Sequence, residues 1–275
     1  MQGVFVLQKE VGETPLDVIN AFKATHSEYQ QIPMAYAGRL DPMASGLLLV
    51  LAGDECKRQE HYHNLDKEYQ FEVLFGVSSD TADVLGLLQW QDSPEASLAQ
   101  LKRIAHSLHG HITLPYPHFS SRTVQGKPLH TWTLEGRLDE IEIPTKTSTI
   151  FKLSCTNVRT VSKGEIIKTA LEKIETIPPV TDERKALGAD FRRTDVRASW
   201  ATFAADMSTP STYQIATFTC IASSGTYMRT LAEIIAKQVS TSGLAFSIHR
   251  TKIGRYKSLP FGFGYWSERF LLESA

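Results

Sequence analysis

The sequence predicts an α+β protein built around one large mixed sheet. Four short segments have the apolar pattern of strands, and three carry apolar residues at helical spacing. Because these segments do not follow one another in a regular strand–helix–strand repeat, an α+β domain is favoured. The chain has 275 residues, 42% of them hydrophobic, which is enough for the core of one large domain or two small ones.

Local signals predict the individual elements. After a short strand at 4–8, a helix begins at Thr14-Pro15 and runs to about Ala24, since threonine is a favoured N-cap and proline fits the first helical position. Alternation predicts strands at 69–75, 151–158 and 213–221. Recurrent leucine, isoleucine and alanine predict helices at 97–108 and 225–239.

The composition argues against several kinds of protein. Cys56, Cys155 and Cys220 are far apart, which argues against a disulfide framework and structural zinc. The histidine clusters lack cysteines or carboxylates at ligand spacing, so we expect no metal and no other cofactor. The start of the chain does not resemble a signal peptide and no apolar run could span a bilayer, so we expect a cytoplasmic protein without membrane contact.

The net charge of −1 means that any affinity for nucleic acid must come from a local patch. The sequence HRTKIGRYK at 249–257 is one candidate, with four cations and no acid. A solvated face at the end of a strand is the alternative interpretation.

One carboxylate is placed unusually within residues 35–53, AYAGRLDPMASGLLLVLAG. Pro42 fixes its own φ and pushes Asp41 towards extended backbone. Gly38 and Gly46 would let the backbone pass close to a ligand. The segment therefore presents Asp41 on a stiff loop at the edge of an apolar core element, although aspartate before proline is also common in ordinary turns.

The string GRLDPMASGLL at 38–48 resembles the catalytic motif of the TruB-type tRNA pseudouridine synthases. Three further motifs follow in the family's order: Lys67-Glu68-Tyr69 for K-x-Y, residues 79–86 for T-D-T-x-D-x-x-G, and residues 224–231 for K-G-T-Y-I-R-T-L. Weaker matches lie at 3–9, 119–127 and 249–251. Each motif alone is weak, but four in order are a strong signal, and they cover roughly 3–160 and 212–258.

The resemblance implies a pseudouridine-synthase-type catalytic domain, with a large, mostly antiparallel mixed sheet flanked by helices. We expect residues 1–275 to form this single domain. Residues 160–211 are longer than the family needs and include a charged stretch at 182–195, so we interpret them as an inserted subdomain or lid. The family often carries a C-terminal RNA-binding PUA domain, for which the roughly 15 residues after Pro260 are too few.

The implied reaction breaks the N1–C1′ bond of uridine and rejoins the base through C5, and it needs neither metal nor redox chemistry. The resemblance implies that Asp41 is the nucleophile, whether at C6, C1′ or C2′. Arg229 would grip Asp41, and Asp83 would hold Arg229 in place. Tyr69 would stack on the flipped-out uracil. Without the resemblance, Arg229 would be interpreted as a surface helix residue, Asp83 as a turn cap and Tyr69 as an ordinary strand aromatic.

The resemblance also implies a set of substrate-binding residues. Tyr36 stands where many relatives have histidine, and it keeps a ring for stacking. Lys57 would contact phosphate or solvate a helix. The full set expected to bind RNA is Tyr36, Lys9, Lys57, Arg122, Lys127, Tyr227, Ile248, Arg250 and Lys252.

The expected target is uridine 55 in the TΨC arm of tRNA, bound by a monomer. A non-catalytic tRNA-folding chaperone that keeps the synthase cleft is one alternative, but Asp41, Tyr69 and Arg229 are all present. A hydrolase with an aspartate nucleophile is another. It predicts a metal-binding carboxylate cluster near Asp41, which residues 35–53 lack.

Overall fold

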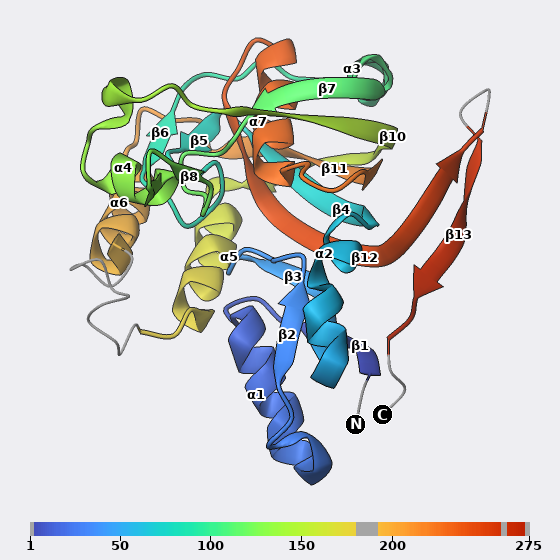
Figure 1. Ribbon diagram of the computed structural model, residues 1–275. Coiled ribbons are helices and arrows are strands. Elements are labelled where there is room, and N and C mark those ends of the chain that lie inside the picture. The colour runs from blue at the N-terminus through green and yellow to red at the C-terminus, as the bar shows by residue number, and fades with distance from the viewer. Residues whose placement is uncertain (1–2, 180–191, 260–262, 273–275) are drawn as a thin grey trace.

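The computed structural model describes residues 3–179, 192–259 and 263–272 and places them around one mixed sheet (Figure 1). In those residues nine strands join in the order β1-β3-β12-β4-β11-β10-β7, with β2 added to β3 and β13 added to β12. The pairs are antiparallel except β3 with β12, which is parallel. The predicted mostly antiparallel mixed sheet is confirmed.

The strands of the sheet are β1 (Gly3–Lys9), β2 (Met34–Ala37), β3 (Ala44–Ala52), β4 (Asp66–Phe75), β7 (Gly110–Pro115), β10 (Thr145–Ser162), β11 (Thr212–Ala222), β12 (Gly243–Ser258) and β13 (Gly264–Phe270). Two small hairpins pair β5 (Val77–Ser79) with β6 (Leu88–Trp90) and β8 (Thr123–Val124) with β9 (Lys127–Pro128). Figure 1 shows the β12–β13 hairpin extending away from the rest of the sheet.

The helices are α1 (Pro15–Thr25), α2 (Gln59–His63), α3 (Leu98–Ser107), α4 (Leu129–Leu134), α5 (Lys163–Thr176), α6 (Arg193–Ala205) and α7 (Met228–Gln238). Short 3-10 turns lie at Ser27–Tyr29, Gly53–Arg58 and Leu138–Glu140. None of these described helices is long and apolar enough to cross a membrane.

The elements predicted from local signals are all present, with shifted ends. Thr14 caps α1 through a capping box with Asp17, which explains why the helix begins there. The strand predicted at 151–158 is the middle of the longer β10. The helix predicted at 225–239 begins later, at Met228, because Gly225 has a φ of +91° and Tyr227 is still extended.

The apolar run in β3 is buried on both faces. Leu48 and Val50 pack against α1, in a cluster with Phe22. Leu49 and Leu51 point the other way and pack with Tyr62 of α2. A strand covered on both faces needs apolar residues throughout rather than alternation, which accounts for the unbroken run that follows Asp41.

The described part of the 160–211 segment has no core of its own. The apolar faces of α5 and α6, including Ile166, Trp200 and Phe203, belong to the main cluster beside Phe218 of β11. The Trp200 indole also donates to the carbonyl of Val84 at 3.0 Å. Of the charged stretch at 182–195, residues 182–191 lie outside the described residues.

Gly46 allows the parallel contact between β3 and β12. Its φ is +109°, and a Cβ there would lie 2.3 Å from the carbonyl oxygen of Arg250. The glycine therefore lets backbone approach backbone, not a ligand as the sequence suggested.

Replacing Gly46 should test this close approach. Gly46→Ala combines an unfavourable φ with a backbone clash, so we expect the free energy of unfolding to fall by about 2–4 kcal/mol. Gly126 is a matched control, because its φ is +78° and no atom lies within 4 Å of an added Cβ. Gly126→Ala should cost only about 1 kcal/mol. Urea unfolding of both variants measures the difference, and equal losses would contradict the proposed clash.

Candidate active site

Three charged side chains from distant segments meet at one end of α7. The Arg229 Nε lies 2.8 Å from Oδ2 of Asp41 and 3.7 Å from Oδ2 of Asp83. The Nε–H is not aligned for a hydrogen bond, so the contact with Asp41 is an ion pair. The sequence motifs predicted that these three residues would act together, and the structure brings them together.

The cluster is buried except for one carboxylate. The side chains of Arg229 and Asp83 are 4% and 5% exposed, whereas that of Asp41 is 40% exposed. The nucleophile expected from the sequence is therefore open to solvent rather than buried. Asp83 is the buried acid, and its charge is the one that needs Arg229 for compensation.

Burial and charge act in opposite directions within the cluster. Burial raises the pKa of Asp83, although Arg229 and a hydrogen bond from Thr81 partly offset the effect. Burial alone would lower the pKa of Arg229, but the neighbouring carboxylates, Asp41 first, raise it. Arg229 thus stays charged, as one cation between two acids.

Backbone carbonyls complete the hold on the guanidinium. Nη1 donates to the Thr81 carbonyl at 2.8 Å, and Nη2 donates to that of Phe119 at 3.2 Å. Oδ1 of Asp83 accepts from the Thr81 hydroxyl at 2.7 Å and from the Leu85 amide at 2.9 Å. The turn at 79–86 is therefore shaped around Asp83 and offers Arg229 both a carboxylate and a carbonyl.

Two interior cations hold the loop that carries Asp41. The Lys9 ammonium donates to the carbonyls of Ala44 at 2.6 Å and Glu10 at 2.9 Å. Arg250 donates to the carbonyls of Leu47 at 2.6 Å and Gly38 at 3.2 Å. Both side chains are buried, so the contact with RNA expected of them does not fit their positions. They support the Asp41 loop from the interior instead.

Lys67 of the K-x-Y motif is a third interior cation. Its ammonium donates to the carbonyls of His63 and Leu65. Burial, with the nearby Arg250, lowers the pKa of Lys67 to about 7. Such a group binds backbone rather than phosphate.

Two aromatic residues predicted from the motifs, Tyr69 and Tyr227, lie on segments that contribute to the site. Tyr69, on β4, pairs in register with Arg250 of β12 and is half-buried against the main core. Tyr227 precedes Met228 and makes an edge-on contact with Tyr116, with ring centroids 5.6 Å apart. Burial is the main reason that the pKa of Tyr227 is raised, and the charge of Asp41 adds to it.

Most of the other predicted RNA contacts already have protein partners. Lys57 pairs with Asp54, Lys127 with Glu135, and Lys252 with Glu68. Arg255 likewise pairs with Glu268, so the cations at 249–257 are partly neutralised or buried. Arg122 lies over the Tyr116 ring.

Two predicted contacts lie further inside. Ile248 is buried in the main core. Tyr36 is half-buried and packs against the apolar cluster formed by α1 and β3. Its carbonyl accepts from the side chain of Gln59.

Sequence reasoning identified residues 119–127 as a weaker family match and Arg122 as an RNA contact, but it missed that Tyr116 and the carbonyl of Phe119 lie beside the charged cluster. Phe119 contributes through its carbonyl, which any residue carries, so its identity gave no signal. Tyr116, between two prolines, could have been noticed as an aromatic on a stiff loop. Arg39, exposed two residues before Asp41, was also missed.

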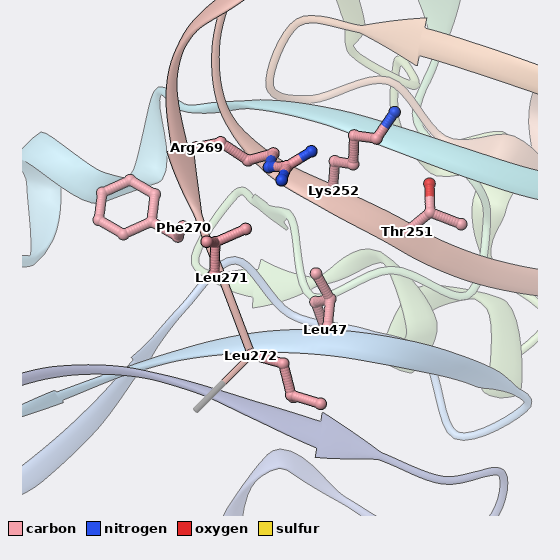
Figure 2. Close-up of a pocket in the computed structure, with 7 residues that line it drawn as sticks. All are labelled: Leu47, Thr251, Lys252, Arg269, Phe270, Leu271 and Leu272. Atoms are coloured by element: carbon pink, nitrogen blue, oxygen red, sulfur yellow. The ribbon is translucent and has the colours of Figure 1, made fainter. Parts of the chain in front are cut away.

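A hollow lies apart from the charged cluster. It has a volume of about 280 Å³ and is lined by Leu47, Thr251, Lys252, Arg269, Phe270, Leu271 and Leu272 (Figure 2). None of the charged cluster lines it. Within the described ranges, no group of three His, Cys, Asp or Glu side chains is arranged to hold a metal ion.

Comparison with known proteins shows the family of the chain. The family model described as TruB family pseudouridylate synthase (N terminal domain) matches residues 21–172, more than half of the chain. The chain belongs to the TruB family. Arg229 and its neighbours in α7 lie beyond the matched segment, so their place in the site comes from the structure and the motifs.

Individual relatives are named tRNA pseudouridine synthase B. This TruB family chain is 26% identical over 254 residues to tRNA pseudouridine synthase B of Caldicellulosiruptor saccharolyticus, covering 92% of the chain and 68% of that protein. It is 30% identical over 154 residues to the protein of that name from Caldanaerobacter subterraneus, covering 56% and 52%. The chain spans little more than half of the length of several such relatives.

A solved structure supports the fold. A chain in the crystal structure of a Cbf5-Nop10-Gar1 complex aligns with 92% of this chain at a TM-score of 0.52 and 15% identity. The match covers 49% of that chain. At this identity the likeness shows a shared fold.

The buried Lys9 predicts a pH dependence of stability. Burial lowers its pKa to about 8 from 10.5. Between these values the unfolded chain binds more protons, so the wild-type protein should gain stability as the pH rises from 8 to 10.5. Below pH 8 the cost of burying the charge is fully present.

Lys9→Met removes this ionisation while keeping the apolar stem. We expect the difference in unfolding free energy, wild type minus Lys9→Met, to increase between pH 7 and pH 10. Denaturant unfolding at several pH values measures it. Lys168→Met, at an exposed position on α5, is the control. A wild-type minus Lys9→Met difference that does not vary with pH would contradict the prediction.

Proposed function

We propose that this chain is a tRNA pseudouridine synthase that uses Asp41 as its nucleophile on a flipped-out uridine. The observation that carries the proposal is a solvent-accessible carboxylate fixed at 2.8 Å by a buried guanidinium. A nucleophile must be accessible to its substrate, and its reacting atom must be held in one orientation. Here exposure supplies the first property and the ion pair with Arg229 supplies the second.

The chemistry needs few other groups. Cleavage of the N1–C1′ bond and rejoining through C5 leave the number of atoms and electrons in uridine unchanged. The Asp41 carboxylate could add to C6 of the base or act at C1′ or C2′ of the sugar, and each route requires it to lie beside the flipped-out uridine. The uracil must stay in place while it rotates, so an aromatic surface beside Asp41 is the second requirement.

Tyr69 is the residue we propose for that surface. Flipping a uridine out of a folded RNA costs a few kcal/mol, and stacking on an aromatic ring returns about 1–3 kcal/mol. Tyr69 lies on β4 next to Arg250, whose guanidinium holds the Asp41 loop. Its phenol would then lie near the C5 proton of the base.

The proposed target is uridine 55 in the TΨC arm, bound by a monomer. The names of the relatives support a tRNA substrate, and the resemblance to the TruB family together with the small size of such a stem-loop favours this arm. Because the interior Lys9 and Arg250 are withdrawn from the surface, phosphate contacts would come from exposed cations near the site such as Arg39 and Arg122.

Mass spectrometry of an unmodified tRNA transcript incubated with the protein tests the activity. We expect pseudouridine at position 55, and none when that uridine is replaced by cytidine. An isolated TΨC stem-loop should react about as well as the whole tRNA. Pseudouridine at another position would overturn the target, and its absence from all tRNA would overturn the activity.

Asp41→Asn should abolish turnover and leave the fold intact. Arg229 would keep Asp83 as its buried partner, so the loss of stability should be small, on the order of 1 kcal/mol or less. RNA affinity should stay within a few-fold, since asparagine keeps the shape of the side chain. Multiple-turnover assays and binding titrations measure both. Asp54→Asn, which removes an exposed carboxylate, is the control; clear turnover by Asp41→Asn would rule out the nucleophile.

Tyr69→Phe should separate stacking from the hydroxyl. We expect RNA affinity within a few-fold of wild type, because the ring remains, and product formation that is reduced by roughly 100-fold. Single-turnover kinetics measure the chemical step. A wild-type rate would show that Tyr69 supplies only a stacking surface.

A further inference from the structure

Arg192, directly before α6, joins two segments that hold the site. It lies outside the part of the chain that matches the TruB family model. Its Nη1 is 2.5 Å from Oδ2 of Asp80, its Nη2 is 3.3 Å from Oδ1, and its guanidinium lies over the Phe119 ring at 4.4 Å. One planar cation thus grips a carboxylate with two nitrogens and covers an aromatic face.

The two partners of Arg192 are closely linked to the two carbonyls that hold Arg229: Asp80 is next to one of them in sequence, and Phe119 carries the other. Asp80 directly precedes Thr81, whose carbonyl accepts from Nη1 of Arg229. Phe119 itself accepts from Nη2 through its own carbonyl. Arg192 therefore connects the turn at 79–86 to the loop at 116–122, the same two segments that hold Arg229.

The rest of α6 is fixed independently of this contact. The Trp200 indole donates to the Val84 carbonyl at 3.0 Å, and the Ser199 hydroxyl accepts from the Leu88 amide at 2.8 Å. The helix is thus attached to the segment that follows Asp83. The backbone of Arg192 has a φ of 61°, in the left-handed region that arginine rarely occupies, and such conformations persist where surrounding contacts require them.

We propose that Arg192 is a positioning residue for the reaction proposed above. By fixing Phe119 against Asp80, it sets the distance between the two carbonyls that hold Arg229, and so the direction in which Arg229 holds Asp41. The 160–211 segment would then contribute to catalysis through this one side chain.

Kinetics of Arg192→Ala test the proposal, which rests on the proposed synthase activity. We expect kcat for tRNA to fall on the order of tenfold, with a smaller change in KM, because the reacting groups lose alignment while the phosphate contacts remain. Arg192→Lys should recover part of kcat, since an ammonium can reach Asp80 or the ring but cannot make both contacts with one fork. Arg192→Ala and Asp80→Asn should be non-additive, because they remove the same contact.

Arg197→Ala is the matched control. Arg197 lies on α6, five residues after Arg192, and pairs with Glu175 of α5 rather than with a residue of the charged cluster. Arg197→Ala removes the same charge and a carboxylate contact made by two guanidinium nitrogens, but its partner is on α5 and not in the 79–86 turn, so a loss that follows only from removing such a pair would appear in both variants. If the two variants lose kcat equally, the proposal is wrong.

Hydrogen exchange gives a readout that does not depend on activity. The amides of Leu129 and His130 donate to the carbonyls of Arg122 and Ser120 and report on how the 116–122 loop is held. Their exchange should be faster in Arg192→Ala than in wild type and unchanged in Arg197→Ala. Unchanged exchange in Arg192→Ala would overturn the clamp. If the wild-type protein forms no pseudouridine, the proposed function fails, and the exchange rates alone decide whether Arg192 positions the loop.

Discussion

The buried guanidinium of Arg229 is the interaction on which the arrangement of the site depends. It joins Asp41, the turn at 79–86 and the loop at 116–122 at a single point. Removing one partner of a buried ion pair typically costs about 3–5 kcal/mol, because the other charge stays buried without compensation. In this site that charge would be on Asp83 and not on Asp41. The carboxylate whose burial bears on stability is thus not the one that we propose as the nucleophile.

Cations near the site have two distinct tasks. Lys9, Lys67 and Arg250 are buried and donate to backbone carbonyls, so they fix the course of the chain. Exposed cations such as Arg39 and Arg122 remain for a polyanion. A nearly neutral protein can thus hold a rigid carboxylate loop and still leave positive charge beside it.

The sequence predicted the elements whose signals are local, and the charged residues that ordered motifs brought together. Thr14 as a cap and the alternation in β4 depend on neighbours a few residues away. The burial of Lys9 and Arg250 could not be predicted, because a lysine or arginine on a strand has the same local pattern whether it points inward or outward. The same holds for Trp200, whose carbonyl partner at Val84 is set by tertiary packing. Arg192 lies in a segment without a family pattern, and its role depends on two contacts that only the fold creates.

The support that Arg250 gives to the Asp41 loop has a consequence for how the protein is made. Gly38 and Arg250, which hydrogen-bond, are 212 positions apart, and β3 gains its parallel neighbour only when β12 is present. A nascent chain that has left the ribosome as far as α6 therefore contains Asp41 and Lys9 but neither Arg229 nor Arg250. During synthesis the site assembles last, after strands β1, β2 and β3 and the covering helix α1 have had time to form.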